Sequence, residues 1–254
     1  MSLPLYCDRS AGQGRTLLLV HGLGANAAVW RGLVSRLSGR WPGSILAPDL
    51  RGHGRSPHGR HYGYGQHAAD LADLLEPGER VCVVAHSMGG VVALVLASGC
   101  YGVSVDAVLG FGIKVNWSEA EIDKAHSLGK QPVRWFDSRR EAAERFLRVS
   151  GLAGLVGENH EAVEAGIRPE HGRWRLAADP ATFSAPGPDF GEIFRLAKTR
   201  ALLACGAKDA MTSVAELRAF APDAVELPGL GHNLHLESPE ALAKLVGKFL
   251  VETA

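Results

Sequence analysis

The residues Val81-Cys-Val-Val-Ala-His-Ser-Met-Gly-Gly90 indicate the fold class most directly, because the pattern changes from a buried strand to a helix at one serine. Its first five residues form an apolar run without polar alternation, which is typical of a strand in a parallel sheet covered on both faces. A serine on so sharp a turn takes strained backbone angles, and only small residues two positions away avoid clashes. Those positions hold Ala85 and Gly89. We therefore predict that Ser87 is a nucleophile raised above the sheet; the alternative is a plain helix N-cap.

Similar apolar runs alternate with helical patterns along the chain. The predicted strands are Thr16–Val20, Ser44–Ala47, Val81–Ala85, Val105–Leu109 and Ala201–Ala204. The predicted helices are Ala27–Leu37, Gln66–Leu75, Met88–Gly99, Ser213–Phe220 and Pro239–Val251. Regular alternation of strand and helix implies right-handed crossovers, and the fold class is therefore α/β, with a mostly parallel, doubly wound sheet.

The segment 113–196 interrupts this alternation. It contains no strand-like run but several amphipathic helical patches, and its ends adjoin predicted strands. We expect a helical cap inserted into an α/β core formed by residues 1–112 and 197–254, with residues 185–188 (Ala-Pro-Gly-Pro) as the exit loop.

Aromatic side chains in the cap suggest an apolar pocket wall, although a cap also needs a small core of its own. The residues expected to line the pocket are Trp30, Arg134, Trp135, Phe136 and Phe146. Trp30 lies outside the cap, and packing of the first helix is the alternative for it. Of the five residues, Arg134 could bind a carboxylate. Other cap arginines are expected on solvated helix faces, namely Arg139, Arg140, Arg145 and Arg148.

The composition excludes several classes of protein. The 254 residues are 46% hydrophobic, and 27 Lys and Arg balance 27 Asp and Glu, so no net charge favours nucleic acid or anionic lipid. The longest apolar run, 91–97, is far shorter than the ~20 residues needed to span a bilayer. Four cysteines lie far apart without metal-binding spacing. We expect a cytoplasmic monomer or homodimer that acts on a small molecule, with no cofactor and no metal.

Two further residues complete the chemistry that a serine nucleophile requires. A serine hydroxyl needs a base, and the base needs an orienting carboxylate. The stretch 226–232 (Glu-Leu-Pro-Gly-Leu-Gly-His) ends a further predicted strand and places His232 in a glycine-flanked loop, and Asp209 follows the predicted strand Ala201–Ala204. Both lie where open α/β sheets place their sites, at the carboxyl ends of strands. We predict Ser87, Asp209 and His232 as nucleophile, acid and base; His235 and Asp223 are the alternatives for the base and the acid.

A glycine turn, His21-Gly-Leu-Gly24, follows the first predicted strand and would expose backbone N–H groups. Such groups can stabilise the oxyanion of a tetrahedral intermediate. We predict the backbone amides of Leu23 and Met88 as the two donors. His21 is expected to be a structural histidine buried beneath the turn.

Four motifs, in this order, resemble those of the α/β-hydrolase-fold superfamily in its capped, single-domain form: Val20-His-Gly22, Pro48-Asp-Leu-Arg-Gly-His-Gly-Arg-Ser56, His86-Ser-Met-Gly-Gly90 and Gly231-His232. The resemblance covers roughly residues 12–112 and 197–254. It implies a cofactor-independent serine hydrolase that cleaves a small, largely apolar ester through an acyl-enzyme. It also implies that Arg51, His53 and Arg55 order a loop near the site. A serine at position 87 disfavours the aspartate nucleophile of haloalkane dehalogenases and epoxide hydrolases.

Two alternative functions share this fold. Residues 231–239 are similar to the C-terminal loop of the menaquinone-pathway synthase that eliminates pyruvate, which favours a lyase or a carbon–carbon bond hydrolase. That family has an arginine after the Gly-Gly pair, whereas this chain has Val91. The second alternative is a hydrolase-like receptor that keeps the three residues but binds its ligand without turnover.

Overall fold

The computed structural model describes residues 2–184 and 189–251, so the predicted exit loop at 185–188 lies outside the described residues. A seven-stranded sheet has the order β1-β3-β2-β4-β5-β8-β9. The strands are β1 (Cys7–Ser10), β2 (Thr16–Val20), β3 (Ile45–Pro48), β4 (Arg80–His86), β5 (Ser104–Phe111), β8 (Arg200–Gly206) and β9 (Val225–Leu227). All neighbours pair in parallel except β1, which runs antiparallel to β3. The predicted doubly wound α/β fold is confirmed.

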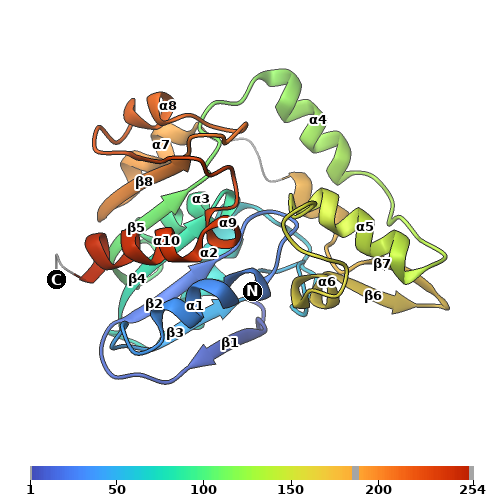
Figure 1. The fold of residues 1–254 in the computed structure, drawn as a ribbon, viewed down its shortest axis with the longest axis horizontal. Helices are drawn as coiled ribbons and strands as arrows, with labels where there is room; N and C mark the ends of the chain where they lie inside the picture. Colours follow the sequence, from blue (N-terminus) through green and yellow to red (C-terminus); the bar gives the residue numbers. More distant parts are fainter. Residues whose placement is uncertain (1, 185–188, 252–254) are drawn as a thin grey trace.

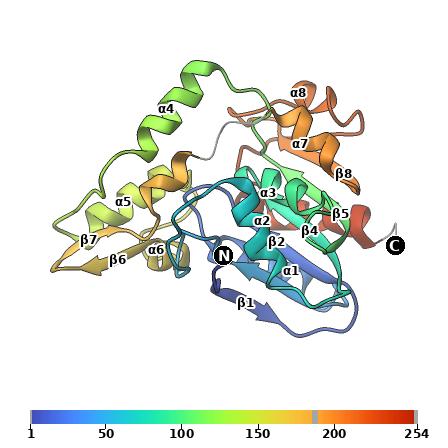
Figure 2. The same cartoon turned by 180° about the vertical axis from the view of Figure 1, so that it is seen from behind.

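Helices cover both faces of the sheet (Figures 1 and 2). One face carries α1 (Arg31–Leu37) and α10 (Pro239–Val246), and the other carries α2 (Tyr64–Ala72), α3 (Met88–Leu96) and α8 (Val214–Arg218). Short helical segments complete the core: η1 (Ala27–Trp30), α9 (Leu234–Glu237) and η3 (Gly247–Val251).

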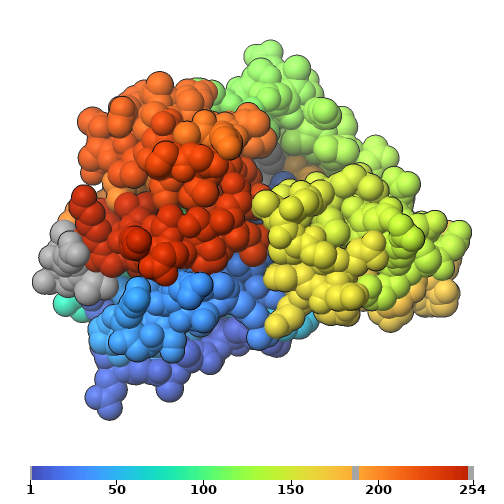
Figure 3. Space-filling view, in the orientation of Figure 1, coloured from blue at the N-terminus to red at the C-terminus, as the bar shows by residue number. Residues whose placement is uncertain are grey.

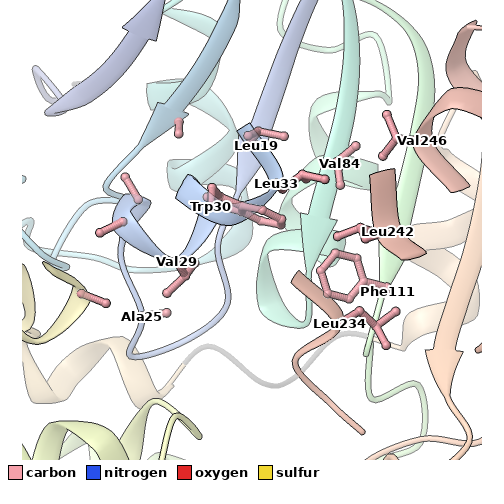
Figure 4. Close-up of a cluster of buried hydrophobic side chains, with 14 of the residues drawn as sticks. Leu19, Ala25, Val29, Trp30, Leu33, Val84, Phe111, Leu234, Leu242 and Val246 are labelled. Atoms are coloured by element: carbon pink, nitrogen blue, oxygen red, sulfur yellow. The ribbon is translucent and has the colours of Figure 1, made fainter. Parts of the chain in front are cut away.

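Each central strand contributes to two hydrophobic clusters. Leu17 and Leu19 of β2 face the cluster around Trp30, whereas Leu18 and Val20 face the cluster around α3. Figure 4 shows the first cluster, where Trp30 and Phe111 lie beside side chains of α1, α9 and α10. Burial on both faces explains why the middle of each central strand shows no alternation of apolar and polar residues, since successive side chains of a strand point to opposite faces.

The cap contains strands as well as helices, so the expectation of helices alone was wrong. It comprises α4 (Glu119–Gly129), α5 (Arg139–Val149), α6 (Glu161–Gly166), β6 (Ile167–Glu170), β7 (Arg173–Leu176) and η2 (Pro180–Ser184). The strands β6 and β7 form an antiparallel hairpin whose turn residues His171 and Gly172 have φ of 51° and 75°. Such a two-residue turn matches the twist of a hairpin. Both strands carry charged residues, so a search for apolar runs does not find them.

The helix α7 (Phe190–Leu196) packs on the core, so the cap boundary predicted at residue 196 lies too late in the chain. Phe190 and Ile193 are buried in the cluster around α3, and the Phe190 ring meets that of Phe220 edge-on at 5.0 Å. The strand β1 was also not predicted, because its four residues are polar and partly exposed at the sheet edge.

None of the helices in the described ranges is both long and apolar enough to cross a membrane.

Candidate active site

Ser87 lies between the last residue of β4 and the first residue of α3, with φ 51° and ψ −121°. Its backbone N–H donates to the Phe111 carbonyl at 2.8 Å, which holds the turn against β5. A side chain at Gly89 would put its Cβ 2.5 Å from the carbonyl oxygens of Val20 and His21. A glycine is therefore required two residues after the serine, as the sequence analysis expected, and the strained angles are fixed by the surrounding sheet.

The structure brings His232 and Asp209 together. Nδ1 of His232 lies 3.0 and 3.1 Å from the two carboxylate oxygens of Asp209. The Asp209 side chain is fully buried, and its Oδ1 also accepts a hydrogen bond from the Met211 N–H at 2.8 Å. Because a carboxylate can only accept, Nδ1 carries the proton and Nε2 is left free to act as a base. Loops after β8 and β9 supply the two residues, as predicted.

The glycine turn after β2 is held from below by His21, which is fully buried. Its Nδ1 donates to the Gly22 carbonyl at 2.8 Å, and its Nε2 accepts from the Leu50 N–H at 2.9 Å. Burial lowers the pKa of His21, so the ring is neutral and structural, as expected. A Cβ on Gly22 would lie 3.2 Å from Cβ of Ser87, so the glycine lets the turn approach the serine closely.

A cavity of about 460 Å³ opens above Ser87. In Figure 3 the surface is hollowed between α4, the segment after α5 and the C-terminal segment. The predicted residues Leu23, Ser87, Met88 and His232 all line this cavity. Met88 is the first residue of α3, so its N–H has no acceptor within that helix.

The five predicted pocket residues do not line this cavity. Trp30 is fully buried against Phe111 and His235 (Figure 4), and Phe146 is buried against Gly166. The Trp135 ring instead packs near His171. Aromatic content alone does not distinguish a pocket wall from the core; here Trp30 and Phe146 belong to the core, whereas Trp135 is half-buried at the surface of the cap.

Arg134 and Phe136 line a second cavity, of about 430 Å³, within the cap. Val149, the last residue of α5, lines both this cavity and the one above Ser87. Arg134 and Phe136 therefore lie next to the cavity above Ser87 rather than in it.

Several residues of the Ser87 cavity were missed by the sequence analysis: Lys114, Trp117, Arg148, Lys208, Met211 and Asn233. Lys208 and Asn233 are sequence neighbours of Asp209 and His232, which could have identified them. Arg148 is exposed, as expected for a solvated helix face, but it also lines the cavity, and no signal in the sequence separates it from the other arginines of α5.

The alternative base and acid lie away from the reacting groups. His235 is fully buried behind the site, and neither ring nitrogen has a hydrogen-bond partner among the described residues. Burial and the neighbouring His232 lower its pKa to about 3. Asp223 is exposed in the turn before β9.

The loop 49–56 is ordered by buried ion pairs, as the resemblance implied. Arg51 makes a bidentate pair with Asp70 at 2.5 and 2.6 Å, and both side chains are almost fully buried. The Asp49 carboxylate accepts from the N–H groups of Ala27 and Arg55 at 2.6 and 2.8 Å. In the part of the chain that the structure describes, no three His, Cys, Asp or Glu side chains are grouped to hold a metal ion.

Comparison with known proteins identifies relatives of this fold. A family model described as "Alpha/beta hydrolase family" matches residues 17–245. The chain is 26% identical to 2-(acetamidomethylene)succinate hydrolase of Mesorhizobium japonicum, over 95% of this chain and 90% of that protein. The crystal structure of E-2-(acetamidomethylene)succinate hydrolase superposes with a TM-score of 0.80 at 23% identity, covering 97% of this chain and 94% of the other.

Higher identities extend over shorter stretches. An uncharacterized protein of Mycobacterium tuberculosis is 42% identical over 92 residues, which are 35% of this chain and about a quarter (26%) of that protein. The pimeloyl-[acyl-carrier protein] methyl ester esterase of Vibrio cholerae is 39% identical over 102 residues, or 38% of this chain and 36% of the esterase.

Proposed function

The chain belongs to the alpha/beta hydrolase family, and on this premise we propose that it is a serine hydrolase that cleaves a small, largely apolar carboxylic ester through an acyl-enzyme. The observation that carries the proposal is the contact of His232 Nδ1 with both oxygens of Asp209, in a histidine that lines the same cavity as Ser87. A relative named as an ester hydrolase adds support for this bond type.

In the proposed reaction, Ser87 Oγ attacks the ester carbonyl while Nε2 of His232 accepts its proton. The buried Asp209 carboxylate keeps the proton on Nδ1 and stabilises the imidazolium. The N–H groups of Leu23 and Met88 donate to the oxyanion; the loss of one such donor typically costs ~10²–10³ in rate. His232 then protonates the leaving alkoxide, and a water activated by the same histidine cleaves the acyl-enzyme.

We also propose a cytoplasmic location, because all four cysteines are free thiols. Disulfides are rare in reducing compartments, and such a compartment keeps thiols in the free form that all four cysteines have, including the buried Cys82 and Cys205.

Labelling with a fluorophosphonate tests the serine. The intact mass of the protein and of Ser87→Ala would be measured after exposure to the reagent, beside initial rates on 4-nitrophenyl esters. We expect one adduct on the parent and none on the variant, with turnover lost in the variant at an unchanged melting temperature. An adduct on Ser87→Ala, or full turnover by it, would overturn the assignment.

The same experiment separates the alternatives. A parent that is folded, unlabelled and inactive on esters would point to the lyase or to the receptor. Release of pyruvate from a suitable enoate would identify the lyase, and tight retention of a ligand without turnover would identify the receptor.

A further inference from the structure

The cavity above Ser87 and the neighbouring cap cavity share one electrostatic property. Among the described residues, five cationic side chains line them and no aspartate or glutamate does: Lys114, Arg134, Arg145, Arg148 and Lys208. The chain as a whole has equal numbers of cationic and anionic side chains. The concentration of positive charge is therefore a property of the two cavities, and a cleft lined by charge of one sign raises the local concentration of ligands of the opposite sign.

The arginines of α5 provide an internal comparison. Arg139 pairs with Glu164, and Arg140 pairs with Glu144 at 3.1 Å; neither arginine lines a cavity. Arg145 lines the cap cavity and Arg148 lines the cavity above Ser87, and neither has an acidic partner within the described ranges. The two cavity-lining arginines of this helix are thus the ones whose charge is left uncompensated.

Position along the helix brings these two arginines together. Arg145 and Arg148 are three residues apart, so their side chains share one face of α5. Val149, four residues after Arg145, lines both cavities and marks the boundary between them. In Figure 1, α5 lies in the cap between α4 and α6. A ligand that reaches from Ser87 into the cap would therefore pass Arg148 first and Arg145 next.

The remaining lining of the cap cavity is mainly apolar and includes Leu128, Val133, Phe136, Leu176 and Phe183. An apolar chain would bury its surface there, whereas an anionic group would need the guanidinium groups at the boundary. Guanidinium presents a planar fork of donors that matches a carboxylate, and hydrogen bonds between charged groups are stronger than those between neutral groups.

We propose that the substrate is an ester that carries a second, ionised carboxylate, held by Arg145 and Arg148 while its ester carbonyl lies at Ser87. This inference rests on the proposed ester hydrolysis and names the substrate class of that site. Lys208 lines the same cavity, and no acidic partner is found for it in the described ranges, so it adds to the positive potential there, whereas the charge of Lys114 is compensated by Glu121 at 2.5 Å.

Two esters with the same leaving group test the proposal: 4-nitrophenyl hydrogen adipate, which is anionic, and methyl 4-nitrophenyl adipate, which is neutral. The readout is the ratio of kcat/KM for the anionic ester to that for the neutral ester. We expect a ratio of at least about ten in the parent, falling about tenfold in Arg145→Gln and in Arg148→Gln. Arg140→Gln, which removes an ion-paired arginine of the same helix, should keep the parent ratio.

A parent ratio of one or less, or an equal fall in Arg140→Gln, would overturn the inference and leave ester hydrolysis standing. Failure of the proposed function would look different, since neither ester would be cleaved and Ser87 would take no fluorophosphonate. Calorimetric titration of Ser87→Ala with monomethyl adipate then measures binding of the carboxylate directly, because this variant lacks the nucleophile that would cleave the ester. We expect binding that weakens about tenfold when Arg148→Gln is added, and equal binding of dimethyl adipate would contradict the proposal.

Discussion

The imidazole of His86 packs edge-on against that of His232, with ring centroids 4.6 Å apart and planes at 62°. Burial, and then the neighbouring His232, hold the pKa of His86 well below its usual value. His86 therefore stays neutral at neutral pH. In the proposed mechanism His232 becomes an imidazolium, and a neutral neighbour adds no charge repulsion to that step.

Asp209→Asn should lower kcat by about 10³–10⁴-fold with a small change in KM. An asparagine amide can donate to Nδ1 and so favour the tautomer with the proton on Nε2, which cannot accept the serine proton. Steady-state kinetics on a 4-nitrophenyl ester would measure the loss. Asp223→Asn, at the exposed alternative acid, is the control and should retain parent rates; the reverse pattern would reassign the acid.

Gly112→Ala and Gly102→Ala form a matched pair of glycine substitutions. Both glycines have positive φ, 62° and 69°, so an alanine at either position should cost about 1–2 kcal/mol of unfolding free energy. A Cβ at Gly112 would lie 3.2 Å from Nδ1 and Cε1 of His232, whereas a Cβ at Gly102 would meet nothing within 4 Å. Urea denaturation should show similar destabilisation, and ester kinetics should show a lower kcat for Gly112→Ala alone. Equal rates in the two variants would contradict the contact with His232.

Asp70→Asn should destabilise the protein by about 3–5 kcal/mol, because it leaves the buried Arg51 guanidinium without its counter-charge. The control is Glu144→Gln, which breaks the exposed pair with Arg140 and should cost less than about 1 kcal/mol. Denaturant unfolding of both variants measures the difference. A cost near zero for Asp70→Asn would show that the loop 49–56 does not depend on this pair.

Acid should destabilise the fold below about pH 6.5. Burial, ahead of neighbouring charges, lowers the pKa of both His67 and His235 to about 3. An unfolded histidine has a pKa near 6.5, so between about pH 6.5 and 3 the unfolded chain binds more protons than the folded chain. The free energy of unfolding therefore falls as the pH falls, by about 1.4 kcal/mol per pH unit for each such histidine well below pH 6.5.

Urea unfolding between pH 7 and pH 5 measures this slope. His235→Leu removes one titrating group from a site bounded by Trp30, Phe111 and His86, so its stability should fall by about 2 kcal/mol less than that of the parent over these two pH units. An unchanged slope in a folded variant would show that His235 is protonated equally in the folded and unfolded states.

Whether a strand could be predicted from the sequence depended on whether both of its faces are buried. The strands β2, β4, β5 and β8 end within two residues of the predicted bounds, because strands buried on both faces appear in the sequence as continuous apolar runs. The edge strand β1 and the hairpin of β6 and β7 contain charged residues and were missed. Their positions depend on pairing partners that a local pattern does not reveal.

The residues of the candidate site also fall into a group that the sequence predicts and a group that it does not. The backbone features around Ser87 and the positions of Asp209 and His232 were predictable, because they follow strands whose ends meet at one edge of the sheet. The cavity wall was not predictable, because it depends on how α5 packs over that edge. Arg140 and Arg148 look alike in the sequence, and only the packing shows that one pairs with glutamates and the other lines the cavity.

The return of α7 to the core has an evolutionary consequence. The two cavities owe much of their lining to the stretch between β5 and α7, whereas Ser87, Asp209 and His232 come from outside it. Insertions, deletions or recombination within that single stretch of the gene can therefore change the substrate preference while the sheet and the three residues stay the same. Because Phe190 of α7 packs on Phe220 of the core, α7 marks the C-terminal limit of the stretch that can be exchanged.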